Sequence, residues 1–264
     1  CARLTLNINA SLTEQLDRYG LHEVIDGLRR LAERGQIEMT ASAMYHPILP
    51  LIPRSEMIRQ IKLNTEVNRK YFGEAYKPAG FFPPEMCYSR DVAQIAADLG
   101  YRWIIVDEIS ISGRPGNAPC DRVYNINGLK DFYVFFKERA FSSNIAHGTY
   151  QNVEGFIAAL GERIKRHEYL LSGTSGEVYG NNHQGQEKLL SDIYKSRAIG
   201  TCTISDLIIA FKHMESIEPL PSSSNAYEEE MAKGTPYQSW LDPGNELHKL
   251  QWQLTHLAID AINS

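Results

Sequence analysis

The sequence has no long hydrophobic run and no excess of positive charge. No apolar stretch approaches the roughly 20 residues that a transmembrane helix needs. Its 27 Lys and Arg stand against 32 Asp and Glu, a net charge of −5. Nucleic acids and anionic membranes both attract clustered Lys and Arg, so we expect neither as a partner.

The N-terminal residues do not resemble a signal peptide. The chain opens with Cys1 and has no charged region followed by an apolar stretch. We therefore expect a cytoplasmic protein whose first residues are missing upstream of Cys1.

Closely spaced cysteines are also missing. Cys1, Cys87, Cys120 and Cys202 lie far apart, with no CxxC pair. This spacing argues against a disulfide scaffold and against a zinc site built from cysteines. Free thiols in a reducing compartment are the expected state.

The spacings typical of metal and phosphate sites do not occur either. The eight histidines form no HxH or HxxxH pair. The turn Gly173-Thr174-Ser175-Gly176 lacks the Lys of a phosphate-binding loop. We therefore expect neither a metal nor another cofactor.

What the sequence does contain is an alternation of strand-like and helix-like segments. The chain has 264 residues, 43% of them hydrophobic and 22% charged, as in globular proteins. Strands are predicted at 3–8, 37–41, 80–82, 103–106, 168–172 and 199–203, with helices between most of them. This order favours an α/β fold with a parallel sheet or barrel and helices outside. A linker is predicted at 219–225, before a last helix at 245–262.

Polar clusters follow four of the predicted strands. They are Tyr45-His46-Pro47, Pro83-Pro84-Glu85, Asp107-Glu108 and Ser175-Gly176-Glu177. In parallel sheets and barrels, chemistry gathers where the strands end. The four clusters together predict one site at that edge.

Each of these residues also has a plainer interpretation. Glu85, held by two prolines, is either a nucleophile or general acid/base, or a surface residue that closes a loop. His46 either binds a ligand or metal, or is structural. Asp107 is either a second carboxylate or a turn cap, and Arg139 either orients a substrate or is a solvated charge. The aromatic residues, including Trp103 and Trp240, suit sugar stacking and a core equally well.

Several segments, in order, resemble the signatures of glycoside hydrolase family 57, the α-amylase and 4-α-glucanotransferase group. The second signature resembles 35–38 with Tyr45-His46-Pro47-Ile48-Leu49-Pro50. The third resembles Gly80-Phe81-Phe82-Pro83-Pro84-Glu85, and 134–139 looks like the segment with a basic active-site residue. The fourth resembles Ser175-Gly176-Glu177-Val178-Tyr179-Gly180, and 240–254 is similar to the region of the fifth.

The resemblance implies a fold and an activity. The fold would be an incomplete (β/α)7 barrel at 1–218, with its first strand apparently missing, followed by a linker and the start of a helical bundle at 219–264. The reaction would be retaining cleavage or transfer of α-glucosidic bonds in an α-glucan or malto-oligosaccharide, without a metal, and with Glu85 as nucleophile. The implied substrate-binding residues are Tyr45, His46, Trp103, Asp107, Arg139 and Trp240. The oligomeric state stays open.

The sequence also departs from this family at three places. Ser175 occupies the position of the aspartate that acts as general acid, and a serine hydroxyl does not protonate a leaving group near neutral pH. Asn181-Asn182 replaces a His pair, and the segment at 222–225 lacks an expected Trp. Either Glu177 or Asp107 substitutes for the acid, or the chain is a catalytically impaired α-glucan-binding relative. A deacetylase-like sugar enzyme is a third, weaker hypothesis.

Overall fold

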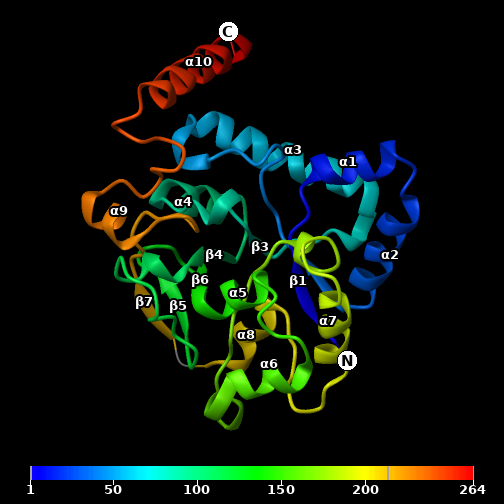
Figure 1. Ribbon diagram of the computed structural model, residues 1–264. Helices are drawn as coiled ribbons and strands as arrows, with labels where there is room; N and C mark the ends of the chain where they lie inside the picture. The colour runs from blue at the N-terminus through cyan, green and yellow to red at the C-terminus, as the bar shows by residue number, and fades with distance from the viewer. Residues whose placement is uncertain (1, 213, 264) are drawn as a thin grey trace.

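The computed structural model describes residues 2–212 and 214–263, and its strands form two sheets (Figure 1). The first sheet pairs β1 (Leu4–Leu6) with β2 (Ile37–Met39) in parallel. The second has the order β3-β4-β6-β5-β7. Its strands are β3 (Gly80–Phe81), β4 (Trp103–Asp107), β5 (Val123–Ile126), β6 (Tyr133–Lys137) and β7 (Met214–Ile217).

A parallel bridge between Ala41 and Phe81 joins the two sheets. The pairs β3–β4 and β4–β6 are also parallel, so β1, β2, β3, β4 and β6 all run in one direction. Among the paired strands of the described residues, β5 and β6 form the antiparallel pair. The predicted α/β class is therefore confirmed, with a mixed sheet.

A closed ring of seven regular strands is not confirmed. The segments 168–172 and 199–203, both predicted as strands, are irregular. They approach neighbouring strands through isolated contacts, such as Glu138 N to Leu171 O at 2.9 Å and Arg3 N to the Thr201 hydroxyl at 3.1 Å. Where side-chain hydroxyls accept the backbone N–H groups, no regular ladder forms.

The helices lie around these sheets (Figure 1). They are α1 (Ala10–Arg18), α2 (His22–Glu33), α3 (Arg54–Phe72), α4 (Arg90–Asp98), α5 (Arg139–Ala146), α6 (Val153–Leu160), α7 (Gln186–Lys195), α8 (Ile204–Ala210), α9 (Glu228–Lys233) and α10 (Glu246–Asn263). Gly20, with φ of 74°, separates α1 from α2, because a left-handed backbone cannot continue a helix.

The predicted role of Trp103 in sugar binding is wrong. Trp103 is the first residue of β4; its side chain is 0% exposed and packs in the core, where its indole N–H donates to the Ser205 hydroxyl at 3.0 Å. A Cβ at Gly80 would lie only 1.9 Å from the indole ring, so only glycine fits beside it. Trp103 therefore stabilises the fold and has no surface for a ligand.

The segment expected to be a linker at 219–225 is fixed against the sheet domain. Leu220 N donates to Ser110 O at 2.7 Å, and Tyr88 and Ser222 exchange two backbone hydrogen bonds of 2.8 and 3.1 Å. Ser222 and Ser223 are 0% and 1% exposed. This segment is a buried part of the fold, and the proposed boundary near residue 218 stays a prediction.

Helix α10 extends away from the body beyond α3 (Figure 1). It contacts the rest of the chain through Trp252, which packs against the main core, and through His256, whose Nε2 lies 2.9 Å from Leu51 O. The apolar face predicted for this helix points outward instead, with Leu247, Leu250, Leu254 and Leu257 all exposed. Within the described residues, no helix has the length and apolar character needed to cross a membrane.

Candidate active site

The carboxyl ends of the parallel strands bring most of the predicted site residues to one edge of the fold. His46 follows the bridge at Ala41, Glu85 follows β3, and Asp107 ends β4. Asp107 is paired in register with Lys137 at the end of β6. Three of the four predicted polar clusters are therefore neighbours in space.

Glu85 stands on a stiff and strained turn. Pro83 and Pro84 restrict the backbone before it, and the turn closes with Met86 N donating to Pro83 O at 2.8 Å. Glu85 itself has a φ of 55°. Of the four non-glycine residues with positive φ in the described chain, three (His46, Glu85 and Met86) belong to this site. Strain concentrated in this way is typical of functional sites.

The Glu85 carboxylate accepts two hydrogen bonds. His46 Nε2 lies 3.1 Å from one oxygen, and the Ser224 hydroxyl lies 3.4 Å from the other. The hydrogen bond from His46, helped by Ser224 and the charge of Lys137, holds the pKa of Glu85 below its usual value despite partial burial. Since the side chain is still 36% exposed, Glu85 presents an ionised carboxylate that a ligand can reach.

The hydrogen bonds of Asn9 indicate which ring nitrogen of a neutral His46 carries the proton. Asn9 Nδ2 lies 3.1 Å from Ala43 O and 3.2 Å from His46 Nδ1. A backbone carbonyl only accepts, so the amide nitrogen must face Ala43 and must also donate to Nδ1. The neutral imidazole then carries its proton on Nε2 and donates it to Glu85.

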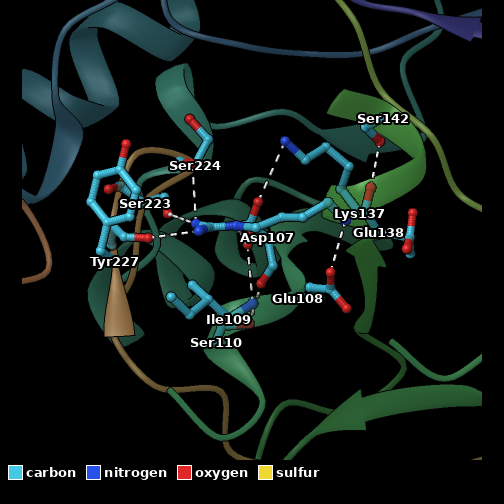
Figure 2. Close-up of polar contacts among 12 residues, drawn as sticks. Asp107, Glu108, Ile109, Ser110, Lys137, Glu138, Ser142, Ser223, Ser224 and Tyr227 are labelled. Atoms are coloured by element: carbon cyan, nitrogen blue, oxygen red, sulfur yellow. Dashed lines mark hydrogen bonds and ion pairs between the residues drawn. The ribbon is translucent and has the colours of Figure 1, made fainter. Parts of the chain in front are cut away.

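Asp107 is completely buried, and Figure 2 shows its side chain beside that of Lys137. One carboxylate oxygen accepts from Arg139 Nε at 2.6 Å and from Ile109 N at 3.0 Å, and Lys137 Nζ lies 3.4 Å from the other oxygen. Burial raises the pKa of Asp107 against the opposing effect of the two cations. With 0% exposure Asp107 touches no ligand, so the expectations that it binds substrate or replaces the general acid are wrong.

Arg139 is also engaged by the protein, and its expected role as a substrate ligand stays a prediction. Besides Asp107, its guanidinium donates to Ala226 O at 2.7 Å, Ser224 O at 3.1 Å and Ser223 O at 3.2 Å. Its side chain is only 20% exposed. Arg139 therefore joins the buried aspartate to the backbone of the segment 223–226.

Ser175 and Glu177 lie on the loop that also contains Gly173. Both residues are exposed, and the Ser175 hydroxyl accepts from Glu177 N at 3.3 Å at the start of a short 3₁₀ turn. A Cβ at Gly173, two residues earlier, would lie 3.2 Å from Lys137, which places this loop beside the cluster. No hydrogen bond or ion pair among the described residues joins Ser175 or Glu177 to Glu85.

The two remaining aromatic residues differ in position. Tyr45 is 62% exposed beside His46, and its predicted contact with a sugar stays a prediction. Trp240 is half-buried in the C-terminal segment, where its carbonyl accepts from Trp252 Nε1 at 2.8 Å. None of the hydrogen bonds of Trp240 reaches the Glu85 cluster, and its predicted contact with a sugar is likewise untested.

Sequence reasoning missed three residues of the cluster: Asn9, Lys137 and Ser224. Lys137 ends a strand in the segment that carries Arg139, so its position was a usable signal. Asn9 and Ser224 have no local signature, since each reaches the site through contacts distant in sequence. No group of three His, Cys, Asp or Glu suited to a metal ion occurs in the described part of the chain.

Comparison with known proteins identifies the family. Residues 2–218 match the family model described as "Glycosyl hydrolase family 57". This chain belongs to glycosyl hydrolase family 57. The family match includes His46, Glu85, Asp107, Lys137 and the loop of Ser175, but ends before Ser224.

Individual relatives match the sequence of this chain over shorter stretches. Alpha-amylase 1 of Dictyoglomus thermophilum is 36% identical over 87 residues, 33% of this chain and 12% of that protein. The 1,4-alpha-glucan branching enzyme TK1436 of Thermococcus kodakarensis is 27% identical over 176 residues, 65% of this chain and 23% of that protein. The matched segments are thus a small part of these longer enzymes.

A solved structure of a family 57 branching enzyme from Thermococcus kodakaraensis superposes with a TM-score of 0.71 at 18% sequence identity. The superposition covers 87% of this chain and 55% of that one. At this identity the likeness supports the fold alone. It agrees with the α/β fold described above.

Proposed function

We propose that this chain carries the nucleophile side of a retaining enzyme that acts on α-glucosidic bonds. The observation that supports this most strongly is the Glu85 carboxylate, ionised, accessible and held by His46 and Ser224 on a strained turn. The names of the family relatives, α-amylases, 4-α-glucanotransferases and a branching enzyme, indicate an α-glucan as the substrate class.

In the proposed reaction, the Glu85 carboxylate attacks the anomeric carbon. An ester bond to the sugar forms as the bond from that carbon to the leaving oxygen breaks. The leaving oxygen takes a proton from an acid. Water or an acceptor hydroxyl then attacks the same carbon, loses its proton to that acid's conjugate base, and frees Glu85. A depressed pKa suits the first step because only the ionised carboxylate is a nucleophile.

A second candidate function is α-glucan binding without efficient turnover. Ser175 stands at the acid position, the Glu177 side chain has no hydrogen bond or ion pair with the described residues, and Asp107 is buried. Loss of general acid catalysis typically costs 10²–10⁴-fold in rate. The chain would then keep the nucleophile and the substrate site but cleave unactivated glucans slowly.

Two substrates separate these functions. Maltoheptaose needs protonation of its leaving group, whereas α-maltosyl fluoride releases fluoride without an acid. An active enzyme with a substitute acid should turn over both substrates. A chain that lacks only the acid should consume the fluoride alone, and a binding relative should bind maltoheptaose in calorimetry while consuming neither.

The matched variant for this experiment is Glu85→Gln, which keeps the size of the side chain and removes the nucleophile. We expect it to reduce turnover of α-maltosyl fluoride by at least about 10³-fold, as removal of a nucleophile does elsewhere. Glu74→Gln, at an exposed residue outside the cluster, serves as the control. Fluoride release that persists unchanged in Glu85→Gln would contradict the assignment of the nucleophile.

A further inference from the structure

We infer that Arg139 is a positioning residue that sets the reactivity of Glu85 through Ser224, with buried Asp107 as its anchor. The inference rests on the proposed function, because it concerns the same nucleophile. It gives Arg139, Asp107 and the segment 223–226 a role that neither the family match nor the sequence motifs assign to them.

The first step concerns the hydrogen-bonding capacity of Arg139. A guanidinium offers five N–H donors in a fixed plane. One is used on Asp107 at 2.6 Å, and others reach the carbonyls of Ser223, Ser224 and Ala226 at 2.7–3.2 Å. These three contacts lie on one short stretch of backbone, so Arg139 fixes the position of the segment 223–226.

The second step concerns what holds Arg139. Asp107 is 0% exposed and accepts from Arg139 and from Ile109 N, while Glu108 accepts from Arg139 N at 2.8 Å. Arg139 is therefore held by two adjacent acidic residues at the end of β4: Asp107 accepts from its side chain and Glu108 from its backbone N–H. Moving Arg139 would leave the buried Asp107 with Lys137, 3.4 Å away, as its counter-charge, and would break the shorter of its two ion pairs.

The third step leads from the segment to the nucleophile. Ser224 N donates to Glu85 O at 2.9 Å, and the Ser224 hydroxyl lies 3.4 Å from the Glu85 carboxylate. The same residue whose carbonyl accepts from Arg139 thus contacts both the backbone and the side chain of Glu85. The path from Asp107 through Arg139 and Ser224 to Glu85 consists of direct contacts only.

The groups that face Glu85 come from separate elements. His46 and Ser224 contact the carboxylate directly, and Lys137 on β6 acts on it by charge. Arg139 acts on Glu85 only through Ser224, since none of its hydrogen bonds reaches the carboxylate. This separation makes the inference testable by combining variants.

The experiment uses Arg139→Lys, Ser224→Ala and the double variant in the full chain. Lysine keeps the positive charge but cannot hold three carbonyls and an aspartate at once. We expect kcat for α-maltosyl fluoride to fall about 10- to 100-fold in Arg139→Lys, since small displacements of a reacting group have effects of this size. KM should stay within about twofold of the wild type.

Ser224→Ala should reduce kcat by about 3- to 10-fold, the effect of one weak hydrogen bond to a charged group. If Arg139 acts through Ser224, the double variant should be little worse than Arg139→Lys alone. Independent, multiplying effects of the two substitutions would overturn the inference.

A second readout does not depend on turnover. The pKa of Glu85, measured by ¹³C NMR of the labelled carboxyl group, should rise in Ser224→Ala and in Arg139→Lys, because both release the hydroxyl that favours the ionised form. Ser143→Ala is the control, since the Ser143 hydroxyl lies 3.2 Å from His147 Nδ1 and outside the segment 223–226. Arg122→Lys, at an ion pair with Glu215 directly before β5, controls for a general effect of the substitution.

These readouts distinguish the two ways of failing. If the wild type consumes no glycosyl fluoride but the pKa of Glu85 responds as expected, the proposed function fails and the positioning role stands. If Arg139→Lys lowers the melting temperature while the pKa of Glu85 stays unchanged, Arg139 is structural only. Should Arg139→Lys not fold, an unchanged pKa in Ser224→Ala would be sufficient to reject the inference.

Discussion

The two sides of the candidate site are built differently. On the nucleophile side, the Glu85 carboxylate is held by His46 and Ser224, and Asp107 pairs with Arg139 nearby. On the opposite side, Ser175 and Glu177 are exposed, and no ion pair of the described residues involves the Glu177 side chain; their hydrogen bonds run to backbone N–H groups of the same loop. Strict positioning is therefore kept where a nucleophile would act, and is missing where a general acid would act.

This difference teaches that the two halves of a catalytic pair need not be maintained together. The nucleophile side has a structural use as well, because its hydrogen bonds fix the segment 222–226 to the sheet domain. The side chains of Ser175 and Glu177 are exposed, so these two residues bury little of their surface in the fold. A site of this kind can lose its acid without loss of structure.

The largest expected effect comes from restoring the acid with Ser175→Asp. If only the acid is missing, hydrolysis of maltoheptaose should increase by about 10²–10⁴-fold. Turnover of α-maltosyl fluoride should change little. The measurement is initial rates on both substrates, with Ser172→Asp, at another exposed serine of this loop, as the control. Equal gains from both variants would show that added charge, not the restored acid, is responsible.

Asp107→Asn should destabilise the nucleophile side by about 3–5 kcal/mol, because it leaves the largely buried Arg139 guanidinium without its counter-charge. Thermal and denaturant unfolding measure this effect. Asp98→Asn is the matched control, since Asp98 pairs with Arg54 at the surface and should contribute less than about 1 kcal/mol. Similar losses from both would contradict the difference in burial.

His46→Ala should shift the pH dependence of turnover. The hydrogen bond from His46 lowers the pKa of Glu85 in the folded protein. Its removal raises that pKa, so the acid limb of kcat/KM should move to higher pH. His46→Gln retains an N–H donor and should restore part of the effect. A profile unchanged in His46→Ala would show that His46 does not tune Glu85.

Glu177→Gln should have the smallest effect. Glu177 is exposed, and its side chain has no hydrogen bond or ion pair with the described residues. Turnover of α-maltosyl fluoride should therefore stay within about threefold of the wild type, and the free energy of unfolding within about 0.5 kcal/mol. Initial rates on maltoheptaose are the sharper check. A loss of 10²-fold or more there would identify Glu177 as a substitute acid and would remove the contrast between the two sides.

Much of the site was predictable because strand ends carry a local signal. Polar residues directly after apolar runs identified His46, Glu85 and Asp107, and parallel strands bring such positions together. The role of each residue was less predictable. Asp107 and Arg139 have the composition of a substrate site, but burial makes them internal supports.

The errors in the fold have a related cause. The segments 168–172 and 199–203 have strand-forming residues, yet hydroxyl groups and isolated contacts take the place of a ladder. Trp103 was assigned by its residue type, whereas the glycine opposite it makes room for the indole in the core. Residue type alone does not indicate which face of a strand is covered.

The sequence by itself determined the α/β class, the stiff proline turn before Glu85 and the serine at the acid position, because these depend on local patterns and residue identity. Only the tertiary structure decided which carboxylate is accessible, that the segment expected to be a linker contacts Glu85 through Ser224, and that Arg139 faces inward. Those properties depend on which distant segments pack together, because packing decides burial. It leaves Glu85 exposed, whereas it buries Asp107 against Arg139.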